Sequence, residues 1–498
     1  MKLPVSSMPK VTIVKDSPTT KHVVVVPISN KKCVIKDQAK YLKQLDLDVF
    51  SGSNLIKIDS KQSLFFVDFP KKDEQVDTDI KKLGFSISSS IKKFDTVVFE
   101  NFDELLSLLS TAASASEDYV RGDALISSPQ ERAMELLLYG IYFGAYEFDN
   151  YLTEKAEIAK KFLLVTSTLD VGCKNVVKKM TNYSKALWFE RDLVNVSPST
   201  STPKWCSDHS ATFLKEAGFS AQILEAPALK QKKYEGIIAV GKGSSQPPSY
   251  LIAKYKHKSA KKHVVLIGKG VTFDTGGVNI KPDGGKNMKG DMSGASTVVA
   301  LGAYLAMNKE KVNLTLYVPF VENHINGLAY RPDDIIEYKN GLSVEVHNTD
   351  AEGRMILADA LIDGSKAKPD LIIDMATLTG ASHVAVGGEA STFYTNRKEM
   401  AKRVNESSAT STELSVELPL IKSYNALLKT DHADVKHTGG RYGGSITAAL
   451  FLQKFVDKDI PWVHFDLSSA FQASSSGIHK AGATGEGLLL GSKLIESL

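Results

Sequence analysis

The sequence is poor in cysteine, with 3 in 498 residues, and none of them forms a Cys-x-x-Cys pair. So few cysteines cannot build a disulfide framework, which indicates a reducing, intracellular setting. A run of about 18 consecutive apolar residues is also missing, so we expect no transmembrane helix. The N-terminal segment lacks the apolar core of a secretory signal peptide, and we therefore expect a cytoplasmic protein.

An excess of one charge sign is likewise missing. The 61 Lys and Arg residues nearly balance the 57 Asp and Glu residues, which leaves a formal net charge of +4. This balance argues against a dedicated nucleic-acid or membrane-surface protein, so we expect neither partner. The strongest basic run is interpreted as a solvated hairpin turn and consists of Lys254, Lys256, Lys258, Lys261 and Lys262.

Three common catalytic signatures are absent from the sequence. Without His-Glu-x-x-His there is no zinc-binding helix of the usual metalloprotease type. Without Gly-x-Ser-x-Gly there is no nucleophile elbow, and without Gly-x-x-x-x-Gly-Lys-Ser/Thr there is no phosphate-binding loop. Any chemistry must therefore come from another arrangement of side chains.

Short apolar runs alternate with helical patterns along the chain, which predicts an α/β fold. We expect a smaller N-terminal α/β domain over residues 1–170, a linking helix over 171–190 and a larger C-terminal α/β domain over 191–498. The N-terminal part shows no chemical motif.

In the C-terminal part the apolar runs are nearly continuous and are separated by helical patterns. This arrangement predicts a mainly parallel sheet with helices on both faces. Ligands of such sheets bind at the carboxyl ends of the strands. Strands are expected at 263–268, 314–318, 371–374 and 462–465, and helices at 293–307, 354–362 and 445–455.

Acidic residues follow these strands or begin the next helices: Asp274, Asp291, Asp350 and Glu352. Four carboxylates in one cleft would repel each other, and two divalent cations would cancel their charge. Oxygen-rich ligation suits Mg²⁺ or Mn²⁺, and carboxylates also bind Zn²⁺. Taken alone, each acid has an ordinary explanation, for example a turn residue at Asp274 or a first-turn helix acid at Glu352.

Three basic residues accompany these acids. Lys269 lies between two glycines, and as a neutral amine it could donate a lone pair to a metal ion. Lys281 and Arg354 would then give the site a surplus of positive charge, which suits an oxyanion or a small bound anion.

Several ordered motifs resemble the cytosol leucyl aminopeptidase family. The heptapeptide 348–354 (Asn-Thr-Asp-Ala-Glu-Gly-Arg) is similar to its signature, and segments 267–277, 376–381 and 439–452 are similar to further family motifs. The resemblance covers the chain from about residue 190 to the end.

The resemblance implies a metal-dependent aminopeptidase that releases leucine and other, mainly apolar, residues from peptides with a free N-terminus. It implies two divalent ions per subunit, Zn²⁺ or Mn²⁺ with Mg²⁺ and Co²⁺ as further candidates, and a bridging water as the nucleophile. The more tightly held ion would be bound by Lys269, Asp274, Asp291 and Glu352. The more exchangeable ion would be bound by Asp274, Asp350 and Glu352.

The resemblance further implies that Lys281 polarises the scissile carbonyl, that Arg354 holds a bicarbonate acting as general base, and that the protein is a homohexamer. Ser468 and Phe471 stand near positions that are usually alanine and methionine, which predicts a more polar or narrower pocket. The residues expected to bind the substrate are Met288, Thr377, Leu378, Gly380, Ser468 and Phe471.

Two alternatives stay open. One is a non-enzymatic binding or architectural protein on the same scaffold, which would be free to lose the ligand set. The other is a different dimetal hydrolase, such as a phosphatase, whose substrate the positive charges would suit. The intact ligand set and the order of the motifs favour the aminopeptidase.

Overall fold

The computed structural model describes residues 8–18, 22–29, 32–33, 54–57, 62–68, 76–91, 95–113, 128–166 and 170–498. The chain divides into two compact units, one ending at Trp188 and the other beginning at Phe189. The division falls inside the long helix α6 (Val171–Asn195). The three domain limits expected from the sequence stay a prediction. None of the described helices has the length and hydrophobicity that crossing a bilayer requires.

In the part of the chain that the structure describes, the N-terminal unit contains a mixed sheet, three complete helices and the first part of α6. Its strand order is β1-β7-β6-β2-β5-β4, with β3 paired to β2, and only the β4–β5 and β2–β3 pairs are antiparallel. The strands are β1 (Lys10–Val14), β2 (His22–Ser29), β3 (Lys32–Cys33), β4 (Asn54–Lys57), β5 (Gln62–Asp68), β6 (Thr96–Phe99) and β7 (Lys161–Val165). The helices are α2 (Val76–Ser90), α3 (Phe102–Ala113) and α5 (Pro129–Gly144).

Helices α2 and α5 approach each other through glycine. A Cβ atom on Gly140 would lie 2.0 Å from the carbonyl oxygen of Lys81, and one on Gly84 would lie 2.3 Å from that of Leu137. Helix α5 starts at a capping box, because the Ser128 hydroxyl accepts from Glu131 N and the Glu131 carboxylate accepts from Ser128 N. The unit is thus held by close backbone packing.

The C-terminal unit is built on a nine-stranded sheet with the order β17-β16-β19-β15-β10-β12-β9-β8, and β11 also pairs with β12. The central strands β19, β15, β10 and β12 run parallel, whereas β9, β8 and β16 join by antiparallel pairs. These strands are β8 (Ser220–Glu225), β9 (Ser249–Tyr255), β10 (Lys262–Gly268), β11 (Gly270–Asp274), β12 (Val312–Asn323), β15 (Leu371–Ala376), β16 (Ala390–Thr395), β17 (Leu414–Glu417) and β19 (Trp462–Asp466).

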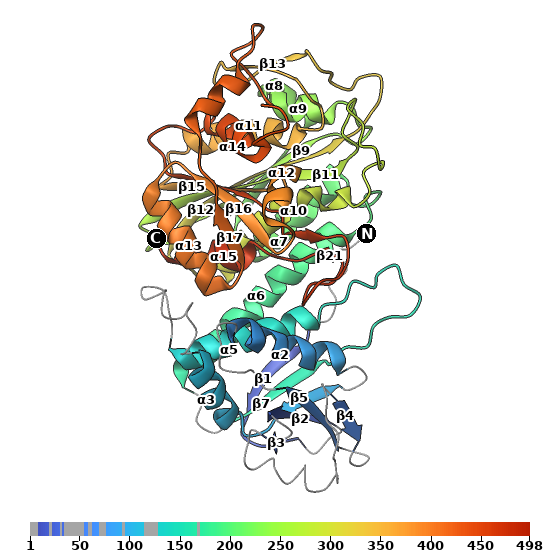
Figure 1. The fold of residues 1–498 in the computed structure, drawn as a ribbon, viewed down its shortest axis with the longest axis vertical. Helices are drawn as coiled ribbons and strands as arrows, with labels where there is room; N and C mark the ends of the chain where they lie inside the picture. The colour runs from blue at the N-terminus through green and yellow to red at the C-terminus, as the bar shows by residue number, and fades with distance from the viewer. Residues whose placement is uncertain are drawn as a thin grey trace. The chain divides into compact units, whose positions relative to one another are not determined.

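Helices cover both faces of this sheet, as Figure 1 shows, with α11 and α14 on one side and α7, α10, α13 and α15 on the other. The helices are α7 (Pro203–Glu216), α8 (Ala226–Gln231), α9 (Glu235–Gly241), η2 (Met288–Met292), α10 (Ser293–Met307), α11 (Glu352–Lys366), α12 (Gly380–Val386), α13 (Lys398–Ser411), η3 (Lys422–Leu428), α14 (Gly444–Gln453) and α15 (Leu488–Glu496). The remaining short strands are β13 (Ile335–Glu337), β14 (Ser343–Glu345), β18 (Val435–Lys436), β20 (Phe471–Gln472) and β21 (Gly482–Ala483).

The expected α/β class with a mainly parallel, doubly covered sheet is confirmed. Burial explains the apolar runs, because residues 264–267 of β10 and Ile372 and Ile373 of β15 are completely buried between the two helical layers. Helix α10 has the expected limits, and α11 begins at Glu352 rather than Arg354.

The interpretation of the basic run as a hairpin turn is wrong. Strands β9 and β10 do not pair with each other, because both pair with β12, which lies between them in the sheet. The lysines of residues 254–262 therefore belong to the ends of these two strands and to a connection that passes over β12.

Candidate active site

The four predicted acidic ligands come from three places in the chain and meet at the carboxyl edge of the parallel strands. Asp274 ends β11, Asp291 lies in the short helix η2, and Asp350 and Glu352 lie at the start of α11. Carboxylate oxygens of Asp274, Asp350 and Glu352 lie within 4.8 Å of one another. Parallel strands direct their carboxyl ends to one edge, which is why residues distant in sequence converge there.

Two lysines lie among these carboxylates. Lys269 Nζ is 2.7 Å from Asp291 Oδ1 and 3.1 Å from Glu352 Oε1. Lys281 Nζ is 2.9 Å from Asp274 Oδ2 and forms a second ion pair with Asp350. When all four carboxylates are ionised, the two ammonium groups offset only half of their charge.

The cluster fits divalent cations. Lys269, Asp274 and Glu352 are each 2% exposed. Among the residues that the structure describes, neither Asp291 Oδ2 nor Glu352 Oε2 has a hydrogen-bond partner. A buried carboxylate oxygen without a donor is costly, and a cation would satisfy it. Carboxylate oxygens with one amine nitrogen form a donor set suited to Mn²⁺ or Zn²⁺.

The pKa shifts reflect both burial and neighbouring charge. Burial, together with the charge of Glu352, raises the pKa of Asp274 to about 7. Burial also raises the pKa of Asp291 far above its usual range, although Lys269 opposes this. For Lys269, burial alone would lower the pKa, but Asp291 and Glu352 raise it above its ordinary value. Burial is thus the main cause of the raised pKa of the two acids, whereas the neighbouring carboxylates set the direction for Lys269.

Further residues hold the ligands in place. Asn323 Nδ2 donates to Asp274 Oδ1 at 2.7 Å and to the carbonyl oxygen of Thr349 at 3.0 Å. Gly276 N also donates to Asp274 Oδ1, at 2.8 Å. Sequence reasoning missed Asn323, although it ends the long buried strand β12 and the strand-end rule could have found it.

One cavity of about 410 Å³ brings most of the predicted residues together. Its lining includes all five proposed metal ligands, Lys281, and the six residues expected to bind the substrate. These are Lys269, Asp274, Asp291, Asp350, Glu352, Lys281, Met288, Thr377, Leu378, Gly380, Ser468 and Phe471. The lining residues that the sequence did not single out include Asn287, Thr379, His383 and Asp466.

Arg354 lies apart from this group. It lines an adjoining cavity of about 490 Å³, which shares Asp350 and residues 378–380 with the first. The reason is helical geometry, because residues two positions apart, such as Glu352 and Arg354, do not face the same direction. Arg354 Nη1 donates to the carbonyl oxygen of His437 at 2.7 Å, whereas Nε has no partner among the described residues. Burial lowers the pKa of Arg354 to about 10.

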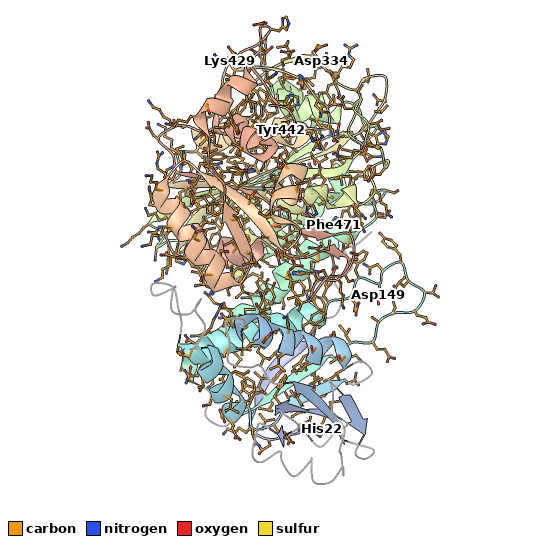
Figure 2. All side chains as sticks on the ribbon, in the orientation of Figure 1. His22, Asp149, Asp334, Lys429, Tyr442 and Phe471 are labelled. Atoms are coloured by element: carbon orange, nitrogen blue, oxygen red, sulfur yellow. The ribbon has the colours of Figure 1, made fainter. Side chains whose placement is uncertain are left out.

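The wall expected to hold the first side chain is narrow. Phe471, labelled in Figure 2, comes from β20, and a Cβ atom on Gly290 would lie 2.6 Å from its ring. The Ser468 hydroxyl is 2.6 Å from the Ser382 hydroxyl, so it already has a partner in the protein. Of the two expected effects, the narrowing of the cavity by Phe471 is therefore the stronger, because the Ser468 hydroxyl already has a partner.

A family profile described as the cytosol aminopeptidase family, catalytic domain, matches residues 188–490. The chain belongs to this family. A protein of Syntrophotalea carbinolica named probable cytosol aminopeptidase is 39% identical over 381 residues, which cover 74% of this chain and 76% of that protein. Membership of the cytosol aminopeptidase family confirms the resemblance and supports a metal-dependent aminopeptidase.

Solved structures agree with this assignment over nearly the whole chain. The cytosol aminopeptidase of Coxiella burnetii matches with a TM-score of 0.78 and 28% identity, covering 97% of this chain and 98% of that one. The bottromycin maturation enzyme BotP in complex with Mn matches with a TM-score of 0.82 and 26% identity, covering 95% and 98%. The cytosol aminopeptidase fold therefore extends beyond the catalytic part.

Proposed function

We propose that this chain removes the N-terminal amino acid from peptides by means of two divalent cations in the 410 Å³ cavity. One observation carries the proposal: four carboxylates converge there, and two of their buried oxygens lack a partner among the described residues. Lys269, Asp274, Asp291 and Glu352 would hold the tighter cation, and Asp274, Asp350 and Glu352 the more exchangeable one. Mn²⁺ and Zn²⁺ are the first candidates, with Mg²⁺ and Co²⁺ after them, and BotP in complex with Mn supports the first.

If bound, two such cations would activate a water as the nucleophile and polarise the scissile carbonyl. The chain contributes the remaining steps. Lys281, whose side chain is 19% exposed in the same cavity, can donate a hydrogen bond to the carbonyl oxygen as negative charge develops there. Arg354 can hold a bicarbonate through its unpartnered Nε, and that anion would accept a proton as general base.

The substrate would be a peptide with a free N-terminus and an apolar first side chain, with leucine among those accepted. Met288, Leu378 and Phe471 give the cavity an apolar wall that supports this preference. We also propose the homohexamer and the cytoplasmic location expected from the family.

The test is hydrolysis of a leucyl arylamide before and after removal of metal ions by a chelator. We expect activity to disappear on chelation and to return with Mn²⁺ or Zn²⁺, and we expect no cleavage of the N-acetylated substrate. Absence of metal-restored activity on any unblocked aminoacyl substrate would contradict the proposal. Metal-dependent hydrolysis of phosphate esters alone would favour another dimetal hydrolase. A salt-dependent shift of DNA or RNA without peptidase activity would favour an architectural protein.

A further inference from the structure

Asp466 is a buried carboxylate at the end of β19, and it is 1% exposed. Its Oδ1 accepts from Leu378 N at 3.0 Å and from Thr379 N at 3.1 Å. Its Oδ2 accepts from Thr379 Oγ1 at 2.6 Å and from Ser445 Oγ at 2.9 Å. Three of its four donors thus belong to the loop that follows β15.

The same loop contacts two of the proposed metal ligands on its other side. The carbonyl oxygen of Thr377 accepts from Lys269 Nζ at 2.7 Å, and Thr377 Oγ1 donates to Asp291 Oδ1 at 3.1 Å. The peptide unit between Thr377 and Leu378 therefore has its N–H on Asp466 and its carbonyl on Lys269. One rigid group links the buried carboxylate to the amine nitrogen.

We infer that Asp466 is a positioning residue for the site, an inference that rests on the proposed function. It holds residues 377–379 so that Thr377 orients the Lys269 amine and the Asp291 carboxylate toward a cation. Groups that hydrogen-bond to metal ligands fix their orientation, and their loss typically weakens metal binding by about 10–100-fold. Residues 378–380 also line both cavities, so the same contacts set the wall between them.

Position and charge can be separated by the choice of substitution. Asp466→Ala removes the acceptor of Leu378 N and Thr379 N. Asp466→Asn removes the charge but keeps one amide oxygen that can accept from both N–H groups. A positioning role predicts a large effect of alanine and a much smaller one of asparagine, whereas a role of charge alone predicts equal effects.

Asp374 provides a matched control. It lies on the neighbouring strand β15, is completely buried, and accepts from Trp462 Nε1 and from His464 Nδ1 rather than from the loop. Asp374→Ala should lower the melting temperature without changing the affinity for metal.

The experiment measures Mn²⁺ binding by equilibrium dialysis, together with kcat, KM for a leucyl arylamide and the melting temperature. We expect Asp466→Ala to bind Mn²⁺ about 10–100-fold more weakly at the site that contains Lys269 and to show a raised KM. Asp466→Asn should keep most of the wild-type affinity, and Asp374→Ala all of it. Should Asp466→Ala not fold, Asp466→Glu displaces the carboxylate by one methylene and should weaken Mn²⁺ binding in the same way.

Three results would overturn the inference alone: wild-type Mn²⁺ affinity in folded Asp466→Ala (or in Asp466→Glu, where that variant replaces it), equal weakening by alanine and asparagine, or equal weakening by Asp374→Ala. A wild-type chain that takes up no Mn²⁺ would overturn the proposed function, and this inference with it.

Discussion

A buried carboxylate inside the central sheet and two buried carboxylates beyond its strands differ in how their oxygens are satisfied. Asp374, inside β15, has both oxygens paired, with Trp462 Nε1 at 2.6 Å and His464 Nδ1 at 2.5 Å. In η2 and at the start of α11, Asp291 and Glu352 each keep one buried oxygen without a partner among the described residues. Single oxygens without a donor also occur elsewhere, for example on Asp359. The metal site is therefore marked by several carboxylates around one cavity, two of which keep such an oxygen.

Position along the strand explains the difference. Asp374 lies directly opposite His464 in the parallel pairing of β15 with β19, so the sheet itself supplies its partner. Asp291 and Glu352 lie outside the strands, in η2 and at the first residue of α11, so strand pairing does not supply their donors. Carboxylates placed there depend on lysines and on cations.

The largest expected effect is on activity, and it comes from changing Glu352, which like Asp291 keeps a buried oxygen without a partner among the described residues. Glu352→Gln removes one charge from the cluster and keeps the shape of the side chain. We expect kcat/KM to fall by about 10³-fold or more, because cation-mediated stabilisation of the transition state amounts to several kcal/mol. The measurement is steady-state hydrolysis of a leucyl arylamide with saturating Mn²⁺.

In chelator the same variant should lose some stability, because burial is outweighed by Lys269 and Lys281, which lower the pKa of Glu352 and so favour its ionised form in the folded protein. The loss should be smaller than for Asp374→Ala, because the glutamine oxygen can still accept from Lys269. Urea denaturation of both proteins checks this point. A variant that retains a tenth of the activity, or one as destabilised as Asp374→Ala, would contradict the distinction between the two kinds of carboxylate.

A smaller but still large effect, on stability, is expected from changing Asp374, whose two oxygens both have partners. Asp374→Ala leaves the buried imidazole of His464 and the indole N–H of Trp462 without their acceptor. Breaking a buried pair in this way typically lowers the free energy of unfolding by about 3–5 kcal/mol. Urea denaturation measures the loss, and the number of Mn²⁺ ions bound per chain should stay unchanged. A loss of Mn²⁺ here would show that Asp374 serves the site as well.

Much of the C-terminal fold could be predicted from the sequence because its strands are buried on both faces. Residues 264–267 and 371–373 are apolar, as strands buried on both faces require, and they lie in β10 and β15. The order of the strands in the sheet could not be predicted from these apolar runs. The insertion of β12 between β9 and β10 depends on a crossover from a distant part of the chain, which the lysine-rich connection does not reveal.

Site residues that follow a strand could be predicted from the sequence. Residues whose role depends on the direction of a helical side chain or on distant hydrogen bonds were harder to predict. Asp274 and Asp350 were found from strand ends and motif order. Arg354 could not be separated from Glu352 by sequence alone, because their different directions depend on where α11 begins. Asp466 was missed because its importance lies in four hydrogen bonds to residues far away in the sequence.

The smallest expected effect concerns the wall of the cavity. Here too a side chain whose polar group already has a partner can be compared with one that has no polar group. The Ser468 hydroxyl is paired with Ser382, so it offers little to a substrate, whereas the Phe471 ring restricts the space beside Gly290. We expect Phe471→Ala to raise the kcat/KM ratio of a phenylalanyl to a leucyl arylamide by about 10-fold, the effect of a few methylenes of added space. Ser468→Ala, the matched control, should change this ratio by less than about 3-fold. If Ser468→Ala had the larger effect, the Ser468 hydroxyl would contact the substrate. Its hydrogen bond to Ser382 would then not be enough to assign it a purely structural role.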